Sequence, residues 1–175
     1  TTEPLQANLP PGGCGPLAIE PAEGGTLAIA GYLAQGRAAS LLAPEVKADM
    51  AWCSKRNVDY APCVYPGFSW FNMLDHGRGD NAMMYPLNQI PRQKGRFYWS
   101  LISGALNAKA KMLYVAMFDE MDEGTAIFKC SNNPPAGVQL CDYEGLPTDH
   151  YLWLTGHAGK MLRGEIPFSR SLPTR

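Results

Sequence analysis

The sequence predicts an α/β protein with a parallel sheet or barrel, because helical and strand-like segments alternate along most of the chain. After residue 45 the order is helix, strand, loop, helix, strand, loop, helix. The strand-like segment 111–118 is apolar almost throughout, which is typical of a strand buried on both faces. Acidic residues follow this segment directly, at the end of a strand where parallel architectures gather their functional groups.

Length and composition restrict the class of protein. The 175 residues correspond to about one domain, and 15 basic against 16 acidic side chains leave a formal net charge of -1. This balance argues against a partner held by charge, so we expect neither nucleic acid nor a membrane as a partner. A hydrophobic content of 46% against 18% charged residues predicts a buried core. No apolar run approaches the roughly 20 residues of a membrane span.

The composition changes near residue 45. The preceding residues are rich in Gly, Pro and Ala and hold one aromatic residue, Tyr32, whereas the other aromatic residues all follow. We therefore divide the chain into a segment 1–44 and the βα units of 45–175. The first segment predicts a loop, a short strand at Thr26–Ala30 and a helix near Gln35–Leu42. The composition of this segment fits three origins: a divergent element of the same fold, an unrelated graft, or translation of a shifted reading frame. Its glycines form no phosphate-binding motif, and we expect no cofactor.

The first βα unit of the second part begins at Pro44, which is suited to the start of a helix. Helical spacing of apolar residues predicts a helix at Glu45–Asn57. Valines, tyrosines and a cysteine predict a strand at Val58–Tyr65, ended by Pro66-Gly67. A long loop through Pro91 carries aromatic residues, and such loops often line binding sites.

Three further elements follow the long loop. An apolar stripe predicts a helix at Gln93–Lys109, and the apolar run predicts a strand at Lys111–Phe118. A second helix is expected at Asp149–Arg163, begun by Thr148 or Asp149 and ended by Gly164.

The five cysteines form no CxxC motif and lie far from the histidines in sequence, so no metal site is expected. Cys130 and Cys141 bracket a Pro-rich turn and would bridge it in an oxidising compartment. The preferred interpretation is that most of the cysteines are small buried side chains.

Four carboxylates follow the strand predicted at 111–118 within five positions: Asp119, Glu120, Asp122 and Glu123. Like charges this close repel each other, so a partly buried member should have a raised pKa. A carboxylate pair with separated pKa values is the usual equipment for glycoside hydrolysis. A solvated acidic turn and a calcium site are the alternatives, although the spacing does not match an EF-hand.

The segment Phe118–Phe128 resembles the N/D-E-x-x-E-G-T signature of glycoside hydrolase family 99, which contains endo-α-mannosidases and α-mannanases. Segments Val64–Trp70, Asn88–Trp99 and Asp149–Leu162 resemble other family segments in the same order. The resemblance, from about residue 45 to 168, implies a (β/α)8 TIM-barrel-like fold. Because such a barrel needs about 250 residues, we expect a partial barrel.

The resemblance also implies roles for two residues. Glu120 matches the base that deprotonates the sugar 2-hydroxyl, so that a 1,2-anhydro sugar forms, and Glu123 matches the general acid/base. Hydrolysis of an α-linked, mannan-like glycan with retention would follow. Asp119 and Met121-Asp122 depart from the residues common in the mannosidases, which bears on the choice of sugar.

Sugar-binding roles follow from the same resemblance. Asn88 and Arg92 would bind sugar hydroxyls, Phe68 occupies the position of a common tyrosine, and Trp70 would stack on a sugar face. Asp119 and Asp122 would line the same site. The expected partner is therefore an oligo- or polysaccharide.

Two alternatives remain beside the enzyme. One is a non-catalytic, lectin-like carbohydrate-binding protein, and the other is a barrel fragment that is inactive alone and self-associates to complete its barrel. The resemblance favours a secreted or periplasmic location.

Overall fold

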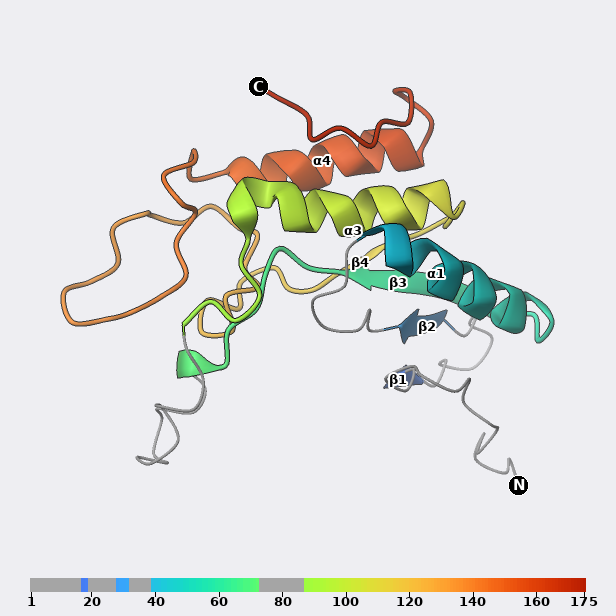
Figure 1. Cartoon of the computed structure of the whole chain (residues 1–175), viewed down its shortest axis with the longest axis horizontal. Coiled ribbons are helices and arrows are strands. Elements are labelled where there is room, and N and C mark those ends of the chain that lie inside the picture. The colour runs from blue at the N-terminus through green and yellow to red at the C-terminus, as the bar shows by residue number, and fades with distance from the viewer. Residues whose placement is uncertain (1–16, 19–27, 32–38, 73–86) are drawn as a thin grey trace.

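A computed structural model describes residues 17–18, 28–31, 39–72 and 87–175, with side chains from Val46 onward (Figure 1). The alternation of strands and helices confirms the α/β class. The elements in chain order are β1 (Leu17–Ala18), β2 (Ala28–Gly31), α1 (Ala39–Ser54), β3 (Asp59–Val64), the 3₁₀ turn η2 (Gln93–Gly95), α3 (Arg96–Asn107), β4 (Tyr114–Val115) and α4 (His150–Leu162).

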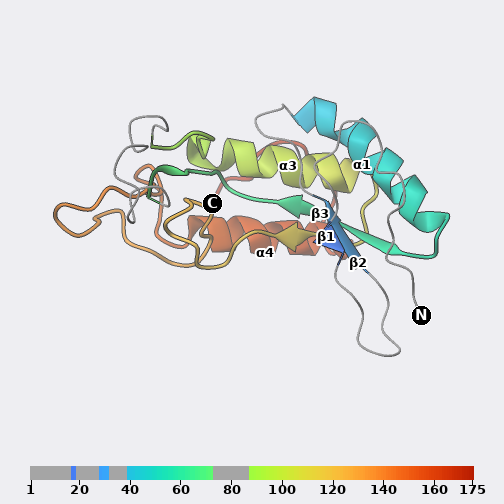
Figure 2. The same ribbon diagram turned by 90° about the horizontal axis from the view of Figure 1, so that it is seen from below.

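The strands pair in the order β1-β2-β3-β4. Strands β2 and β3 are parallel, as are β3 and β4, with Cys63 opposite Tyr114, whereas β1 adds to the edge in the antiparallel direction. The views in Figures 1 and 2 place α1, α3 and α4 on one face of this sheet. The predicted parallel sheet is therefore confirmed within the described residues.

Helix α1 corrects two expectations. A helix near Gln35–Leu42 and a second helix after Pro44 were expected, but one helix spans Ala39–Ser54 with Pro44 as its sixth residue. Proline lacks only its own N–H, so a single backbone hydrogen bond is forfeited near the start of the helix. The expected boundary between residues 44 and 45 consequently lies inside α1.

Strand β2 also ties the early part of the chain to the main sheet. It pairs with β3 over four residues, from Ala28 opposite Asp59 to Gly31 opposite Pro62. This pairing agrees with a strand near Thr26–Ala30. Several expected features lie outside the described residues: most of the loop before that strand, the segment around Tyr32, Cys14 and the centre of the long loop.

Strand β4 is shorter and more exposed than its sequence predicts. A strand buried on both faces was expected at Lys111–Phe118, but β4 covers Tyr114–Val115, and Tyr114 and Phe118 are exposed. The reason is its place in the described sheet, where β4 pairs with β3 and forms the edge. A run of apolar residues is typical of a strand whose two faces are both covered.

Helices α3 and α4 lie where the sequence predicts them, with ends set by local backbone geometry. The predicted start at Gln93 is a 3₁₀ turn, because Lys94 and Gly95 have φ angles of 54° and 86° and separate it from α3. Asp149 occupies the N-cap position of α4 without a side-chain capping hydrogen bond; its carboxylate instead pairs with Arg175 at 2.8 Å.

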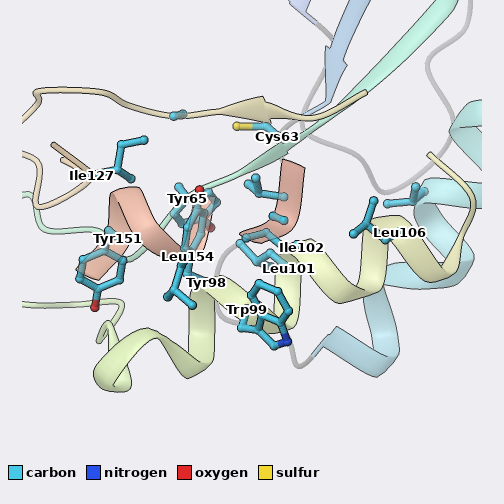
Figure 3. Close-up of a cluster of buried hydrophobic side chains, with 14 of the residues drawn as sticks. Cys63, Tyr65, Tyr98, Trp99, Leu101, Ile102, Leu106, Ile127, Tyr151 and Leu154 are labelled. Atoms are coloured by element: carbon cyan, nitrogen blue, oxygen red, sulfur yellow. The ribbon is translucent and has the colours of Figure 1, made fainter. Parts of the chain in front are cut away.

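The core fixes both helices against β3. Figure 3 shows Trp99 and Leu101 of α3 in one cluster with Leu154 of α4 and Cys63 of β3, all of them buried. Burial of one large apolar side chain contributes about 1.5–3 kcal/mol. This cluster therefore sets the positions from which the loops after β3 and β4 depart.

The described cysteines are free thiols: Cys53, Cys63, Cys130 and Cys141. Three of them are buried, which agrees with the preferred expectation of small buried side chains. In the part of the chain that the structure describes, no helix combines the length and apolar character needed to cross a membrane.

Candidate active site

The candidate site lies where β3 and β4 end. Because the two strands are parallel neighbours, their carboxyl ends lie at the same edge of the sheet. The loop after β3 carries Phe68 and Trp70, and the loop after β4 carries Glu120 and Glu123. A 2.7 Å hydrogen bond from the Ser69 N–H to the Glu123 carbonyl joins these loops directly.

The acidic loop is a closed turn held by its own backbone. The carbonyl of Phe118 accepts hydrogen bonds from the N–H groups of Ile127 and Phe128 at 3.0 and 2.9 Å. Further along, the carbonyl of Glu120 accepts hydrogen bonds from Thr125 and Ala126 at 3.2 and 3.0 Å. The carboxylates at 119–123 therefore project from the tip of a defined turn.

The carboxylates differ in their surroundings. Asp119, Glu120 and Asp122 are exposed, whereas Glu123 is half-buried. Burial, followed by the nearby charge of Glu120, raises the pKa of Glu123 above its ordinary value. This agrees with the expectation that a partly buried member of the cluster has a raised pKa. A carboxyl with a raised pKa stays protonated longer as the pH rises, which suits a proton donor.

The aromatic loop places a large ring beside the acidic turn. Phe68 pairs with Ile90 through reciprocal backbone hydrogen bonds of 3.0 and 2.9 Å. The backbone N–H of Trp70 donates to Gln89 Oε1 at 2.6 Å. The ring of Trp70 packs edge-on against that of Phe68, with their centroids 5.1 Å apart. With 37% of the residue exposed, the indole is open to a ligand.

Asn88 joins the same group of residues. Its N–H donates to Ser69 Oγ at 3.2 Å, and its backbone has a φ of 65°, a conformation that asparagine adopts more readily than most residues. Its Oδ1 atom is buried and has no hydrogen-bond partner among the described residues. The structure thus brings Asn88, Phe68 and Trp70 together with the acidic turn.

Arg92 differs from its sequence-based expectation. Only 2% of the residue is exposed, so its guanidinium is not presented to a sugar in this structure. The Nη1 atom donates to the Ala126 carbonyl at 3.0 Å. The guanidinium also lies over the rings of Tyr143 and Tyr151, at 4.9 and 4.6 Å from their centroids. The expected direct contact with sugar hydroxyls is therefore replaced by contacts within the protein.

Sequence reasoning missed three residues that shape the site: Ser69, Cys141 and Tyr143. Cys141 lies under the turn, where its Sγ would be 3.1 Å from a Cβ atom at Gly124. Burial raises the pKa of the Cys141 thiol. These residues act through contacts between segments distant in sequence, and Cys141 and Tyr143 lie outside the segments that resemble the family. Among the described residues, no three His, Cys, Asp or Glu side chains are grouped to hold a metal ion.

Parallel strands with helices on one face and carboxylates at their carboxyl ends define part of a (β/α) barrel with an acidic site. The chain belongs to glycosyl hydrolase family 99, which it matches over residues 29–163. This match begins inside β2, so it includes part of residues 1–44, the segment that differs in composition from the rest of the chain.

This chain covers only part of the proteins to which it is similar. The chain is 28% identical over 111 residues to a glycoprotein endo-α-1,2-mannosidase-like protein of Danio rerio, covering 62% of this chain and 23% of that protein. Two solved structures of the family 99 endo-α-mannosidase from Bacteroides thetaiotaomicron align with TM-scores of 0.57 and 0.60, at 22% and 23% identity. These alignments cover 70% and 77% of this chain but 36% and 38% of the enzyme. The chain therefore spans less than two fifths of these relatives and forms a partial barrel.

Proposed function

We propose that this chain carries the catalytic carboxylates of a glycoside hydrolase that cleaves an α-linked, mannan-like glycan with retention of configuration. The observation that carries the proposal is the acidic turn at the carboxyl edge of the sheet. There Glu123 is half-buried and has a raised pKa, while Glu120, three residues away, is exposed. Family membership and the endo-α-mannosidase relatives support the reaction class.

In the first step Glu120 acts as the base. Its carboxylate takes the proton of the sugar 2-hydroxyl while that oxygen attacks the anomeric carbon. The bond from this carbon to the leaving oxygen breaks, and Glu123 donates its proton to that oxygen. A 1,2-anhydro sugar and the shortened glycan result, with Glu120 protonated and Glu123 ionised.

In the second step the two carboxyls exchange roles. Glu123 takes a proton from water, the water oxygen attacks the anomeric carbon, and the bond from that carbon to the 2-oxygen opens. The 2-oxygen recovers a proton from Glu120. Two inversions at one carbon give net retention, and both side chains return to their starting protonation states.

The neighbouring residues supply binding in this proposal. The exposed indole of Trp70, supported edge-on by Phe68, offers an apolar plane to the C–H face of a sugar. Asn88 lies beside the same loop, and Asp119 and Asp122, each directly before one of the two glutamates, offer acceptors for sugar hydroxyls. Arg92 is left out of direct binding because it is buried.

Isosteric amides test the assignment. Glu123→Gln and Glu120→Gln should each lower cleavage of an α-mannan oligosaccharide by roughly 10²-fold or more, since each removes a proton-transfer group. Glu165→Gln is the matched control, because Glu165 is an exposed glutamate paired with Arg163 outside the site. Cleavage by Glu123→Gln at the rate of Glu165→Gln would overturn the proposal.

The exposed indole of Trp70 favours a second candidate, a lectin-like protein that binds glycans without cleaving them. Glycan binding that survives the double change Glu120→Gln/Glu123→Gln and is lost in Trp70→Ala, without any cleavage by the unsubstituted chain, would select this function. Calorimetric titration with the same oligosaccharide distinguishes the two candidates.

The edge position of β4 favours a third proposal, that further strands complete the barrel around this site. Tyr114 and Phe118 leave 40% and 59% of their surfaces exposed beside this edge, which is a known liability for pairing with another chain. If copies of this chain pair there, the thermal melt should shift upward with protein concentration. A melt that is independent of concentration would contradict self-association.

A further inference from the structure

We propose that Arg92 is a positioning residue which, together with Tyr143, holds the returning limb of the acidic turn and thereby fixes Glu120 and Glu123 for hydrolysis. Arg92 does not touch the sugar in this proposal. The kinetic part of the proposal rests on the proposed function, whereas the structural part can be tested without any activity.

The geometry links Arg92 to Glu120 through a single residue, Ala126. The N–H of Ala126 donates to the carbonyl of Glu120 at 3.0 Å. The carbonyl of Ala126 accepts a hydrogen bond from Arg92 Nη1 at 3.0 Å. Ala126 is itself fully buried, so the charge-assisted bond from Arg92 orients a backbone segment that has no access to water.

Tyr143 holds the next part of the same limb. Its hydroxyl lies 2.5 Å from the carbonyl of Phe128 and 3.2 Å from that of Ala126. A hydroxyl has one proton, so the shorter contact to Phe128 receives it and the carbonyl of Ala126 depends mainly on Arg92. Arg92 and Tyr143 therefore hold the carbonyls of Ala126 and Phe128 in the limb that returns from the turn.

The guanidinium packs against two neighbouring aromatic rings, whose centroids lie 4.7 Å apart. Tyr143, and Tyr151 from α4, place their centroids 4.9 and 4.6 Å from its central carbon. A planar guanidinium stacks on such faces and keeps a fixed fork of donors, whereas a lysine ammonium does neither. The orientation of Nη1 toward Ala126 is thus set by the core of the protein rather than by solvent.

The stem of Arg92 also contacts the aromatic loop. A Cβ atom at Gly67 would lie 2.8 Å from Arg92 Cγ and 2.8 Å from the Ile90 carbonyl, so only glycine allows this approach. One buried side chain therefore connects the loop after β3 with the loop after β4. A change at Arg92 should move the acidic turn relative to that aromatic loop.

Arg92→Lys tests the proposal and keeps the positive charge. Arg56→Lys is the matched control, because Arg56 is exposed on the surface after α1, with its guanidinium 3.8 Å from the ring centroid of Trp52. With an α-mannan oligosaccharide, Arg92→Lys should lower kcat by about tenfold or more with KM changed by less than about twofold. Arg56→Lys should leave both constants unchanged.

The second readout is the carboxyl titration of Glu123, followed by ¹³C NMR in the absence of sugar. Loosening of the turn exposes Glu123 to water, so its titration midpoint should fall toward the ordinary glutamate value in Arg92→Lys and stay in place in Arg56→Lys. If the unsubstituted chain cleaves no glycan, the proposed function fails, and this titration still decides the positioning role.

Tyr143→Phe provides a milder variant in case Arg92→Lys does not fold. Its matched control is Tyr98→Phe. The hydroxyl of Tyr98 lies 2.9 Å from Thr155 Oγ1, and this contact is remote from the turn. Tyr143→Phe should shift kcat and the Glu123 midpoint in the same directions as Arg92→Lys, by less. If these variants lower only the Tm and leave kcat and the Glu123 titration midpoint unchanged, the proposal is overturned. If Arg92→Lys raises KM at constant kcat, Arg92 is assigned to sugar binding instead.

Discussion

The backbone N–H of Ser69 donates a 2.7 Å hydrogen bond to the carbonyl oxygen of Glu123. Ser69 is fully buried, and its Oγ accepts a further hydrogen bond from the N–H of Asn88 at 3.2 Å. Three segments that lie far apart in sequence therefore meet at one serine. The position of the half-buried carboxyl of Glu123 depends on the loop that carries Trp70.

Crowding beneath the turn should reduce catalysis. Gly124 has a φ of 64°, and a Cβ atom there would lie 3.1 Å from Cys141 Sγ, so Gly124→Ala should both strain the backbone and displace Glu123. We expect a fall in kcat of roughly tenfold or more, because small displacements of reacting groups are costly. Addition of Cys141→Ala removes the Sγ contact and should restore part of the loss. Full activity of Gly124→Ala alone would contradict this placement of the turn.

The charge of Glu120 should influence the titration of Glu123. Burial and Glu120 both raise the pKa of Glu123, so Glu120→Gln removes one cause and should lower the midpoint, which should stay above the ordinary value. The control Glu165→Gln should leave it unchanged. ¹³C NMR of the Glu123 carboxyl measures the effect. A midpoint that rises, or that does not move, would show that the two carboxyls do not interact.

The raised pKa of Glu123 also sets the direction of two pH effects. The folded state binds this proton more tightly than the unfolded chain, so the stability contributed by Glu123 is present at low pH and declines as pH rises through its titration range. Cleavage should decline over the same range, because the first step uses the protonated acid. A pH–rate profile whose alkaline limb does not follow the Glu123 midpoint measured by NMR would contradict its role as the acid.

Substitution of two glycines with positive φ distinguishes the cost of backbone strain alone from the cost of strain combined with crowding. At Gly95, with φ of 86°, a Cβ atom would lie 2.8 Å from Leu154 Cδ1, whereas at Gly145, with φ of 75°, it would meet nothing within 4 Å. Gly145→Ala should cost about 1 kcal/mol and Gly95→Ala about 2–4 kcal/mol of unfolding free energy. Urea denaturation measures both. Equal losses would show that Gly95 does not lie against Leu154 of α4.

Truncation of the core should loosen the packing of α4. Leu154 is fully buried, so Leu154→Ala should lower the free energy of unfolding by about 2–5 kcal/mol. Val138 is 45% exposed in the loop before α4, and Val138→Ala should cost less than about 0.5 kcal/mol. A loss at Leu154 as small as that at Val138 would be inconsistent with the core in Figure 3.

Local patterns in the sequence were sufficient for much of the fold. Strand-prone residues predicted β3, an apolar stripe predicted α3, and start and stop residues predicted α4. The alternation of these elements predicted the parallel sheet. The acidic turn was also visible, because four carboxylates directly follow an apolar run. These features depend on neighbouring residues, which one sequence displays directly.

Features that depend on contacts between distant segments were missed. Pro44 indicated a helix start, but the helix begins earlier and continues through it. The run at 111–118 indicated a strand buried on both faces, but β4 is short and both Tyr114 and Phe118 are exposed. Arg92 was expected to bind sugar hydroxyls, but it is buried and its guanidinium lies against Tyr143 and Tyr151. Tyr143 lies outside the segments that resemble the family, and nothing in the sequence places either ring beside Arg92.

The most direct test follows the anomeric product of an α-mannan oligosaccharide by time-resolved ¹H NMR, with the unsubstituted chain and with Glu123→Gln. We predict that the unsubstituted chain first releases the α anomer, which then equilibrates slowly, and that Glu123→Gln releases almost none. First appearance of the β anomer would contradict the two-step mechanism. Equal release by both proteins would remove Glu123 from the reaction, and no release by the unsubstituted chain would contradict hydrolysis by this chain.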